Sequence, residues 1–419
     1  MNKQKVFHFT KLLGSTFLLQ ALVQACGMLV GFYIVRMLSV QEYAYYTIAN
    51  SMLVLLNIIS DSGVSTAVFA LGGKVWQDKE KLGSVMNTAI AFRNKFALVS
   101  LVLGLPFVVY MLMEQSIPIT TIILIILAFI PSFKSQLTDG LYEMVPKLHQ
   151  DLKILQKNQI MVAVFRVFLT GVALFVFPFT WVALLANGIP RMYGNIRLRH
   201  IVKERADLTQ PQETEYKKEI TRIVKRSFPG VVYFAFSGQI SLFIMSFMGK
   251  TNNIAQWGAL GRYTVIYTIF SMVVGLVLMP RYARKENVRS ILLINSFQIL
   301  FLTLIGGSVI IGLTYIFSDQ LLLLLGKEYQ GLSTELIVSM LNGLIGIFGG
   351  LAINFTLRKG WIIHPAIDLA INIVPMVLFA YLIPFNSLLN VLLYGTAVAL
   401  FNFLAHYIAF FIQLFKYTK

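Results

Sequence analysis

The residues of this sequence most able to do chemistry are charged side chains that interrupt long apolar runs. A charge at the centre of a bilayer costs at least about 2.5–3.5 kcal/mol, so it persists only where it faces protein, water or a ligand. Cations outnumber anions in this set, which favours an anionic ligand, because guanidinium groups bind phosphate oxygens bidentately and keep their charge when partly desolvated. The candidates are Asp61, Arg93, Lys95, Arg166, Arg191, Arg262 and Asp368.

The depth of each cation in its apolar run separates two interpretations. Arg93 and Lys95 lie within about two helical turns of one end of their run, and Arg191 is placed similarly. For these three we favour side chains that extend to the bilayer surface. Arg166 lies eight residues into its run, about 12 Å by helical rise, so we favour a cavity-facing or ion-paired role for it.

The remaining charged candidates each keep two interpretations open. Asp61, within NIISDSGVSTA, is expected to pair with a cavity arginine, and a coupling-ion site is the alternative. Arg36 and Arg262 lie near the outer ends of their runs, where they either contact lipid headgroups or form a phosphate-attracting rim. His364 and Asp368 are four residues apart and share a helix face; we expect a structural hydrogen bond, with proton handling as the alternative.

The composition of the chain is that of an integral membrane protein. Of its 419 residues 57% are hydrophobic and 13% charged, whereas soluble globular proteins carry about 25% charged residues. Apolar stretches of about 20 residues, enough to cross about 30 Å of hydrocarbon, recur throughout and leave no segment for a soluble domain. The single cysteine, Cys26, lies in the first apolar run and cannot form a disulfide within one chain.

The sequence carries no pattern typical of an enzyme or of a nucleic-acid-binding protein. It lacks metal-ligand clusters, phosphate-cradling glycine loops, nucleophile elbows and paired carboxylates. A glycan polymerase or ligase would need a large outer loop, and the largest here, 318–334, is short. The basic residues form short clusters between apolar runs and no basic domain. We expect no enzyme, no nucleic-acid partner, no metal and no other cofactor; coupling to H⁺ or Na⁺ stays open.

Twelve membrane spans can be placed on the sequence, separated by short polar segments. When the connections are assigned alternately to the two sides, only Arg36, Lys250, Arg262 and Lys327 fall near one of them. By the positive-inside rule the other side is the cytoplasm, and it holds both termini. The basic segment 1–11 precedes a long apolar run without a cleavage pattern, so we expect a retained helix. The spans are 14–36, 44–72, 87–113, 117–137, 158–177, 180–198, 228–248, 256–279, 291–317, 335–356, 365–382 and 388–414.

The longest polar stretch, 199–226, divides the spans six and six. We therefore expect an N-terminal lobe over 1–198, a cytoplasmic linker over 199–226 and a C-terminal lobe over 227–419. A weak similarity between the segments that begin at Arg36 and Asn253 supports two related halves. In the linker, Ile220, Ile223 and Val224 share one helix face, as in a helix lying on anionic headgroups; a solvated connector is the alternative.

Several motifs are shared with a known group of transporters. The segment 31–67 contains an arginine, a Leu-Ser turn, a Glu-Tyr element and an Asp-x-Gly element, followed by SFPGV at 227–231, GRY at 261–263, MPR at 279–281 and LLGKEY at 324–329. With these motifs the chain resembles Wzx-type O-antigen and polysaccharide flippases of the multidrug/oligosaccharidyl-lipid/polysaccharide (MOP) exporter superfamily. It departs from them at Ala44, which replaces the usual glycine, and at Gln239 and Ser241, where many relatives have an acidic residue. The residues of the first segment that match are Arg36, Leu38, Ser39, Glu42, Tyr43, Tyr46, Asp61 and Gly63.

The resemblance implies an all-α integral membrane protein with two six-helix lobes in a MATE-like, V-shaped arrangement. It implies a flippase in the bacterial inner membrane that moves an undecaprenyl-pyrophosphate-linked oligosaccharide to the outer leaflet by alternating access. Its partners would be this lipid-linked glycan, membrane lipids and other polysaccharide-assembly proteins. The alternative, an ion-coupled small-molecule exporter, would need acidic cavity residues, of which the sequence has few. We predict substrate binding by Arg36, Arg93, Lys95, Arg166 and Arg262, with Asp61 and Asp368 balancing charge or coupling an ion.

Overall fold

The structure is a computed structural model that describes residues 3–361 and 363–418, without the side chains of residues 3–17, 276–277 and 365–366. Within these residues all regular elements are helices. The chain divides into two compact units, Met1–Ala255 and Gln256–Lys419. The all-α membrane architecture expected from the sequence is thereby confirmed.

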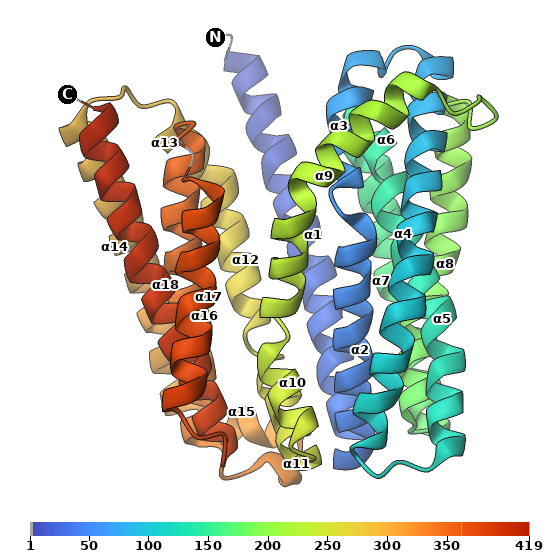
Figure 1. The fold of residues 1–419 in the computed structure, drawn as a ribbon, viewed down its shortest axis with the longest axis vertical. Helices are drawn as coiled ribbons and strands as arrows, with labels where there is room; N and C mark the ends of the chain where they lie inside the picture. Colours follow the sequence, from blue (N-terminus) through green and yellow to red (C-terminus); the bar gives the residue numbers. More distant parts are fainter. Residues whose placement is uncertain (1–2, 362, 419) are drawn as a thin grey trace. The chain divides into compact units, whose positions relative to one another are not determined.

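The first unit contains the helices that correspond to the first seven predicted spans (Figure 1). The fourth span continues through a short helix, α6, and the second and seventh are each broken into two helices. Met1 and Asn2 of the predicted N-terminal segment lie outside the described residues. The helices are α1 (Lys3–Met37), α2 (Val40–Asp61), α3 (Val64–Val75), α4 (Lys79–Met113), α5 (Ile119–Tyr142), α6 (Met144–Leu148), α7 (Leu152–Val176), α8 (Thr180–Arg205), α9 (Thr214–Ser237) and α10 (Ile240–Phe247), and α11 (Thr251–Leu260) begins in this unit.

The second unit contains the helices that correspond to the last five predicted spans. A π-helical turn, η1 (Val274–Leu278), interrupts the eighth span. The other elements are α12 (Val265–Val273), α13 (Met279–Ala283), α14 (Arg289–Ile316), α15 (Ser318–Leu325), the 3₁₀ turn η2 (Lys327–Tyr329), α16 (Ser333–Arg358), α17 (Pro365–Leu382) and α18 (Leu388–Tyr417).

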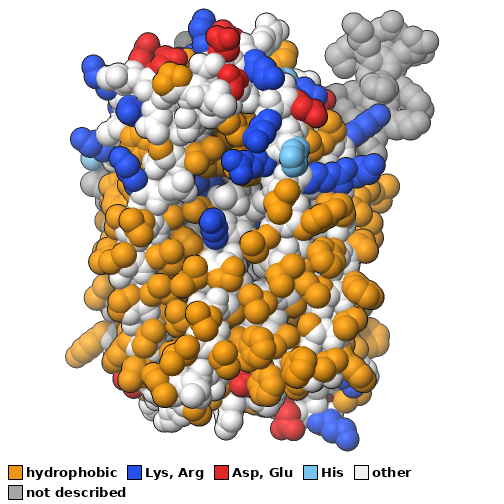
Figure 2. All heavy atoms as spheres, turned by 90° about the vertical axis from the view of Figure 1, so that its right-hand side faces the viewer, with side chains coloured by type: hydrophobic (Ala, Val, Ile, Leu, Met, Phe, Trp, Pro, Cys, Tyr) orange, Lys and Arg blue, Asp and Glu red, His pale blue; other side chains and the backbone are white. Residues whose placement is uncertain are grey.

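The helices have the length and surface of membrane spans. Among the described residues seven helices are each long and apolar enough to cross a membrane, and nine spans result if each bent pair counts as one. Large apolar side chains such as Leu103 and Phe168 are about two-thirds exposed, at 71% and 68%. Figure 2 shows a broad apolar belt on the side of α5 and α8, with Lys and Arg gathered toward the end where α3 and α6 lie. This surface is that of a multi-pass membrane protein.

The break between α2 and α3 follows from two residues in the left-handed region of backbone space. Ser62 has φ 45° and Gly63 has φ 88°, and the helix axis turns by 44° there. A Cβ atom at Gly63 would lie 2.9 Å from Cβ of Ser227 in α9. Glycine therefore serves both the turn and the close approach of α9, since only glycine adopts this conformation without strain.

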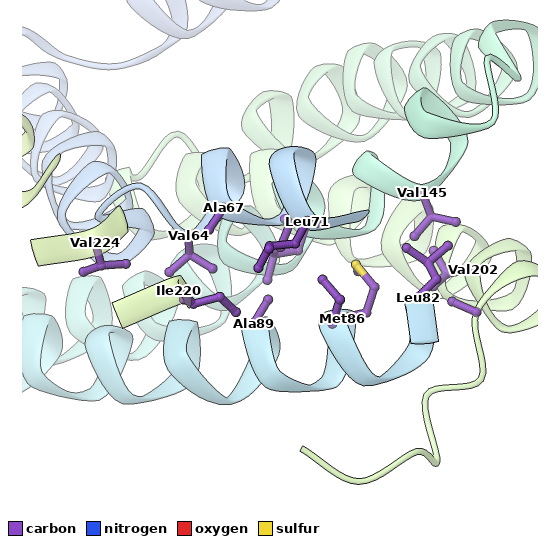
Figure 3. Packing of buried hydrophobic residues seen from close by; sticks show 14 residues of the cluster. Val64, Ala67, Leu71, Leu82, Met86, Ala89, Val145, Val202, Ile220 and Val224 are labelled. Carbon is purple, nitrogen blue, oxygen red and sulfur yellow. The ribbon is translucent and has the colours of Figure 1, made fainter. Parts of the chain in front are cut away.

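The amphipathic segment of the linker packs against protein. Ile220 and Val224 on α9 are buried in a cluster with Val64 of α3 and Ala89 of α4 (Figure 3). Neither expectation for this face, contact with headgroups or with solvent, holds. The linker and α9 belong by their packing to the first unit, which extends to Ala255 beyond the predicted lobe boundary at 227.

Candidate functional site

The interior of the first unit contains a buried ion pair between α2 and α4. Nη1 of Arg93 lies 3.5 Å from Oδ1 of Asp61, and the Arg93 side chain is 7% exposed. The same carboxylate oxygen accepts hydrogen bonds from the backbone N–H of Ser65 (3.3 Å) and from its hydroxyl (2.5 Å). Asp61 therefore caps the first turn of α3 and neutralises Arg93 at once. Pairing of Asp61 with an arginine is the arrangement that the sequence favoured.

The Arg93 guanidinium reaches this position because α5 approaches closely without a side chain. A Cβ atom at Gly140 would lie 3.2 Å from Nη1 of Arg93 and 3.3 Å from Nη2. The guanidinium thus lies against the α5 backbone instead of extending to the bilayer surface as we had expected. Its Nε and Nη1 make no hydrogen bond within the described part of the chain.

A second ion pair lies close by, between α5 and α8. Nε of Arg191 is 3.5 Å from Oδ2 of Asp139, with side chains 31% and 25% exposed. Asp139 is also within electrostatic range of Arg93 and of Arg166. These two pairs and Arg166 form one group, which we call the interior charge cluster: Asp61, Arg93, Asp139, Arg166 and Arg191.

Arg166 differs from the other arginines of the interior charge cluster. It lies near the middle of α7, half-buried, and makes no ion pair with any residue that the structure describes. Its Nε is buried without a hydrogen-bond partner in the same residues. Because the two carboxylates of the cluster already have arginines, Arg166 gives it an excess positive charge.

Other carboxylates of the first unit also have partners. Oε1 of Glu143 accepts from Gln159 (2.9 Å), Oε2 lies 2.8 Å from Nζ of Lys147, and Gln159 in turn accepts from Gln20 of α1 (2.8 Å). Glu42 accepts from the backbone N–H of Thr180 (2.7 Å). These contacts fix helix positions and leave the charge excess with Arg166.

The other predicted site residues lie elsewhere. Lys95 is exposed on α4, and Arg36 is exposed in the last turn of α1. In the second unit Arg262 is half-buried in the turn between α11 and α12. Asp368, near the start of α17, donates its backbone N–H to the carbonyl oxygen of His364 (3.0 Å), and its carboxylate is within electrostatic range of the buried His406.

Sequence reasoning placed Asp61, Arg93 and Arg166 in spans but missed Asp139 and the use of Gly140. Asp139 ends an apolar run, where an acidic residue is usually solvated, and nothing in the sequence shows which helix faces it. The signal that could have found it is Arg191 within the sixth predicted span, because a cation in an apolar run is stabilised by a nearby carboxylate.

Comparisons with known proteins now give this architecture a family. The sequence profile described as polysaccharide biosynthesis protein matches residues 9–283, well over half of the chain. The chain belongs to the polysaccharide biosynthesis protein family. A search of curated protein sequences finds no match to this chain.

Solved structures with a similar fold are transporters and a flippase. An inward-facing multidrug resistance MATE family transporter of the MOP superfamily has TM-score 0.75 at 13% identity, covering 94% of this chain and 95% of its own. Lipid II flippase MurJ in an inward closed conformation has TM-score 0.75 at 11% identity, covering 96% and 91%. A MATE transporter of Vibrio cholerae has TM-score 0.60 at 15% identity, covering 96% and 95%. At these identities the likeness shows the fold alone, which this polysaccharide biosynthesis protein shares with MATE transporters and the MurJ flippase.

Proposed function

We propose that this polysaccharide biosynthesis family protein flips an undecaprenyl-pyrophosphate-linked oligosaccharide from the cytoplasmic to the outer leaflet of the bacterial inner membrane, by alternating access. The observation that carries the proposal is Arg166, a mid-helix guanidinium without a carboxylate partner among the described residues. The family supports a role in polysaccharide synthesis, and the fold supports transport across a membrane.

The interior charge cluster supports an anionic cargo. Three arginines and two aspartates leave one positive charge inside the first unit. The pyrophosphate diester of such a lipid carries two negative charges, and this excess positive charge would offset one of them. One guanidinium donates two N–H bonds to phosphate oxygens, and electrostatic attraction is strong in a low-dielectric interior. Lys95, exposed in the cytoplasmic half of its span, would attract the same group on its approach, and Arg36, exposed near the outer end of α1, would contact it on the outer side.

A cation exporter is the competing function, and the partners of the carboxylates argue against it. Asp61, Asp139 and Glu143 each face a basic group within 3.5 Å. To bind one of these carboxylates, a cationic drug would have to displace its basic partner. An anionic cargo needs no pair to break, so the geometry favours it.

The orientation in this proposal rests on charge. Basic side chains gather toward one end of the first unit (Figure 2), and basic residues are enriched on the cytoplasmic side of membrane proteins. With the twelve spans predicted from the sequence, both termini are then cytoplasmic, and the cargo enters from the side where lipid-linked sugars are assembled.

The test is complementation of a flippase-deficient bacterium by wild type, Arg166→Ala and Arg166→Lys at matched membrane levels. Surface glycan and the lipid-linked unit that accumulates in its absence are both measured. Wild type should restore the glycan, Arg166→Ala should not, and Arg166→Lys should be impaired because an ammonium cannot bind bidentately. Arg197→Ala is the matched control, since this half-buried arginine of α8 contacts the Met161 sulfur (3.3 Å) outside the cluster. A wild type that neither restores glycan nor relieves accumulation overturns the proposal.

A further inference from the structure

The second unit contains a cavity that none of the charged candidates explains. Its volume is about 480 Å³, within the range of ligand-binding pockets. It lies between two neighbouring segments, α12 with the π-helical turn η1 on one side and α16 on the other. Its polar lining consists of Thr264, Tyr267, Thr268, Ser271 and Asn354.

Glycines on one face of α16 create this cavity. Gly343, Gly346 and Gly350 follow each other at spacings of three and four residues, so they share a helix face. A Cβ atom at Gly346 or Gly350 would meet no atom within 4 Å. Packing does not require these two glycines, although glycine within a helix is destabilising. The absence of side chains at these two positions therefore enlarges the cavity.

The backbone on the opposite wall is irregular. Val274 and Gly275 of η1 line the cavity, and a Cβ atom at Gly275 would also meet no atom within 4 Å. Single π-helical turns inside helices occur frequently at functional sites. The π-helical turn on one wall and the glycines of α16 on the other thus face the same cavity.

Tyr267 supplies a polar group that lacks a partner in the protein. The residue is 4% exposed and lines the cavity, and its hydroxyl is buried without a hydrogen-bond partner among the described residues. Its ring lies against Gly343, where a Cβ atom would be 2.6 Å from the ring edge. A buried hydroxyl without a partner is unfavourable, so this group is available to a ligand that donates or accepts a hydrogen bond.

The other polar groups leave further bonding capacity. Nδ2 of Asn354 donates to the carbonyl oxygen of Gly350 (2.8 Å), and its Oδ1 remains an acceptor. The Thr264 hydroxyl donates to the carbonyl oxygen of Gly261 (2.8 Å), which leaves its lone pairs. No lining residue is charged. The lining therefore suits neither a pyrophosphate nor a cation, but it suits a neutral group with several hydroxyls and apolar C–H faces, which is a sugar.

We infer that this cavity binds neutral sugar residues of the transported glycan, with the Tyr267 hydroxyl and the Asn354 amide oxygen as hydrogen-bond partners. The inference rests on the proposed function, because it concerns the glycan of the proposed substrate. The cavity then sets which glycans are carried, since glycine at 346 and 350 leaves room that larger side chains would remove.

The experiment compares two lipid probes in proteoliposomes that contain the full chain. One probe is undecaprenyl pyrophosphate carrying the complete repeat unit, purified from the strain that wild type complements, and the other carries only its first sugar. Gly346→Leu should reduce transport of the complete unit at least about tenfold, as expected when added methylenes fill a pocket. It should leave the single-sugar probe within about twofold of wild type, and Tyr267→Phe should reduce the complete unit about fivefold.

Gly312→Leu is the matched control, because a Cβ atom at Gly312 of α14 also meets nothing within 4 Å but lies outside the cavity lining. Equal unfolding midpoints of all variants would show that they fold. Unchanged transport of both probes by Gly346→Leu, or equal loss of both, would overturn the glycan assignment while the proposed function stands. A wild type that moves neither probe would overturn the proposed function itself.

Discussion

Nη1 of Arg93 lies 3.5 Å from Oδ1 of Asp61, which joins the buried face of α4 to the end of α2. The carboxylate also accepts from Ser65 in the first turn of α3. One side chain thus satisfies a buried cation and caps the helix that follows the break. The Asp61 carboxylate therefore links the break between α2 and α3 to the interior charge cluster.

Asp61→Asn should therefore destabilise the protein. It leaves Arg93 buried without its counter-charge, and we expect a loss of about 3 kcal/mol, the lower end for breaking a buried pair, because the Asp61 side chain is 27% exposed. Denaturant titration in detergent micelles measures the change. The double variant Asp61→Asn, Arg93→Met should recover to within about 1 kcal/mol of wild type, since it removes the buried charge as well. Additive losses from the two substitutions would show that the pair is not coupled.

Gly63→Ala should be destabilising for a backbone reason. Gly63 has φ 88°, and its added Cβ would approach Ser227 to 2.9 Å, so strain and a clash with α9 combine. We expect a loss of more than about 1 kcal/mol. Gly230→Ala on α9, where a Cβ meets no atom within 4 Å, is the control and should be neutral or stabilising. Equal unfolding midpoints for the two variants would contradict the account of the break.

The packing of α9 on α3 and α4 can be tested at Ile220. This side chain is fully buried in the cluster of Figure 3, so Ile220→Ala should cost about 2–5 kcal/mol. Ile223→Ala, one turn away and only partly buried, should cost less than about half of that. A comparable and small effect at both positions in the same titration would mean that this part of the linker does not rest on the first unit.

Asp139→Asn should lower the stability of the protein only slightly and should leave binding of the cargo intact. The Asp139–Arg191 pair is partly exposed, so its loss should cost about 1 kcal/mol or less. The cluster would gain net positive charge, so undecaprenyl pyrophosphate should still raise the unfolding midpoint, as a ligand of the native state does. In Arg166→Ala the same lipid should give no such rise. Loss of stabilisation in Asp139→Asn with retention in Arg166→Ala would reverse these roles.

The positions of the helices were predictable because hydropathy along a chain is a local property, and each of the twelve predicted ranges falls on helical segments. Side-chain partners were harder to predict. Arg93 was expected at the bilayer surface because its depth in the span can be counted, whereas the rotation of α4 that turns it toward Asp61 depends on neighbouring helices. Asp139 was missed for the same reason. The cavity beside Tyr267 depends on which two helix faces meet, and glycine spacing in α16 alone does not show its neighbour.

Transport of a fluorescent undecaprenyl-pyrophosphate-linked oligosaccharide in proteoliposomes is the most direct test of the central claim. Accessibility of the lipid to a membrane-impermeant quencher would be followed for wild type, Arg166→Ala and the control Arg197→Ala, each reconstituted at equal density. The account predicts that wild type and Arg197→Ala exchange the lipid between leaflets well above protein-free vesicles, and that Arg166→Ala falls to the protein-free rate. Exchange by Arg166→Ala at the wild-type rate, or none by wild type, would contradict it.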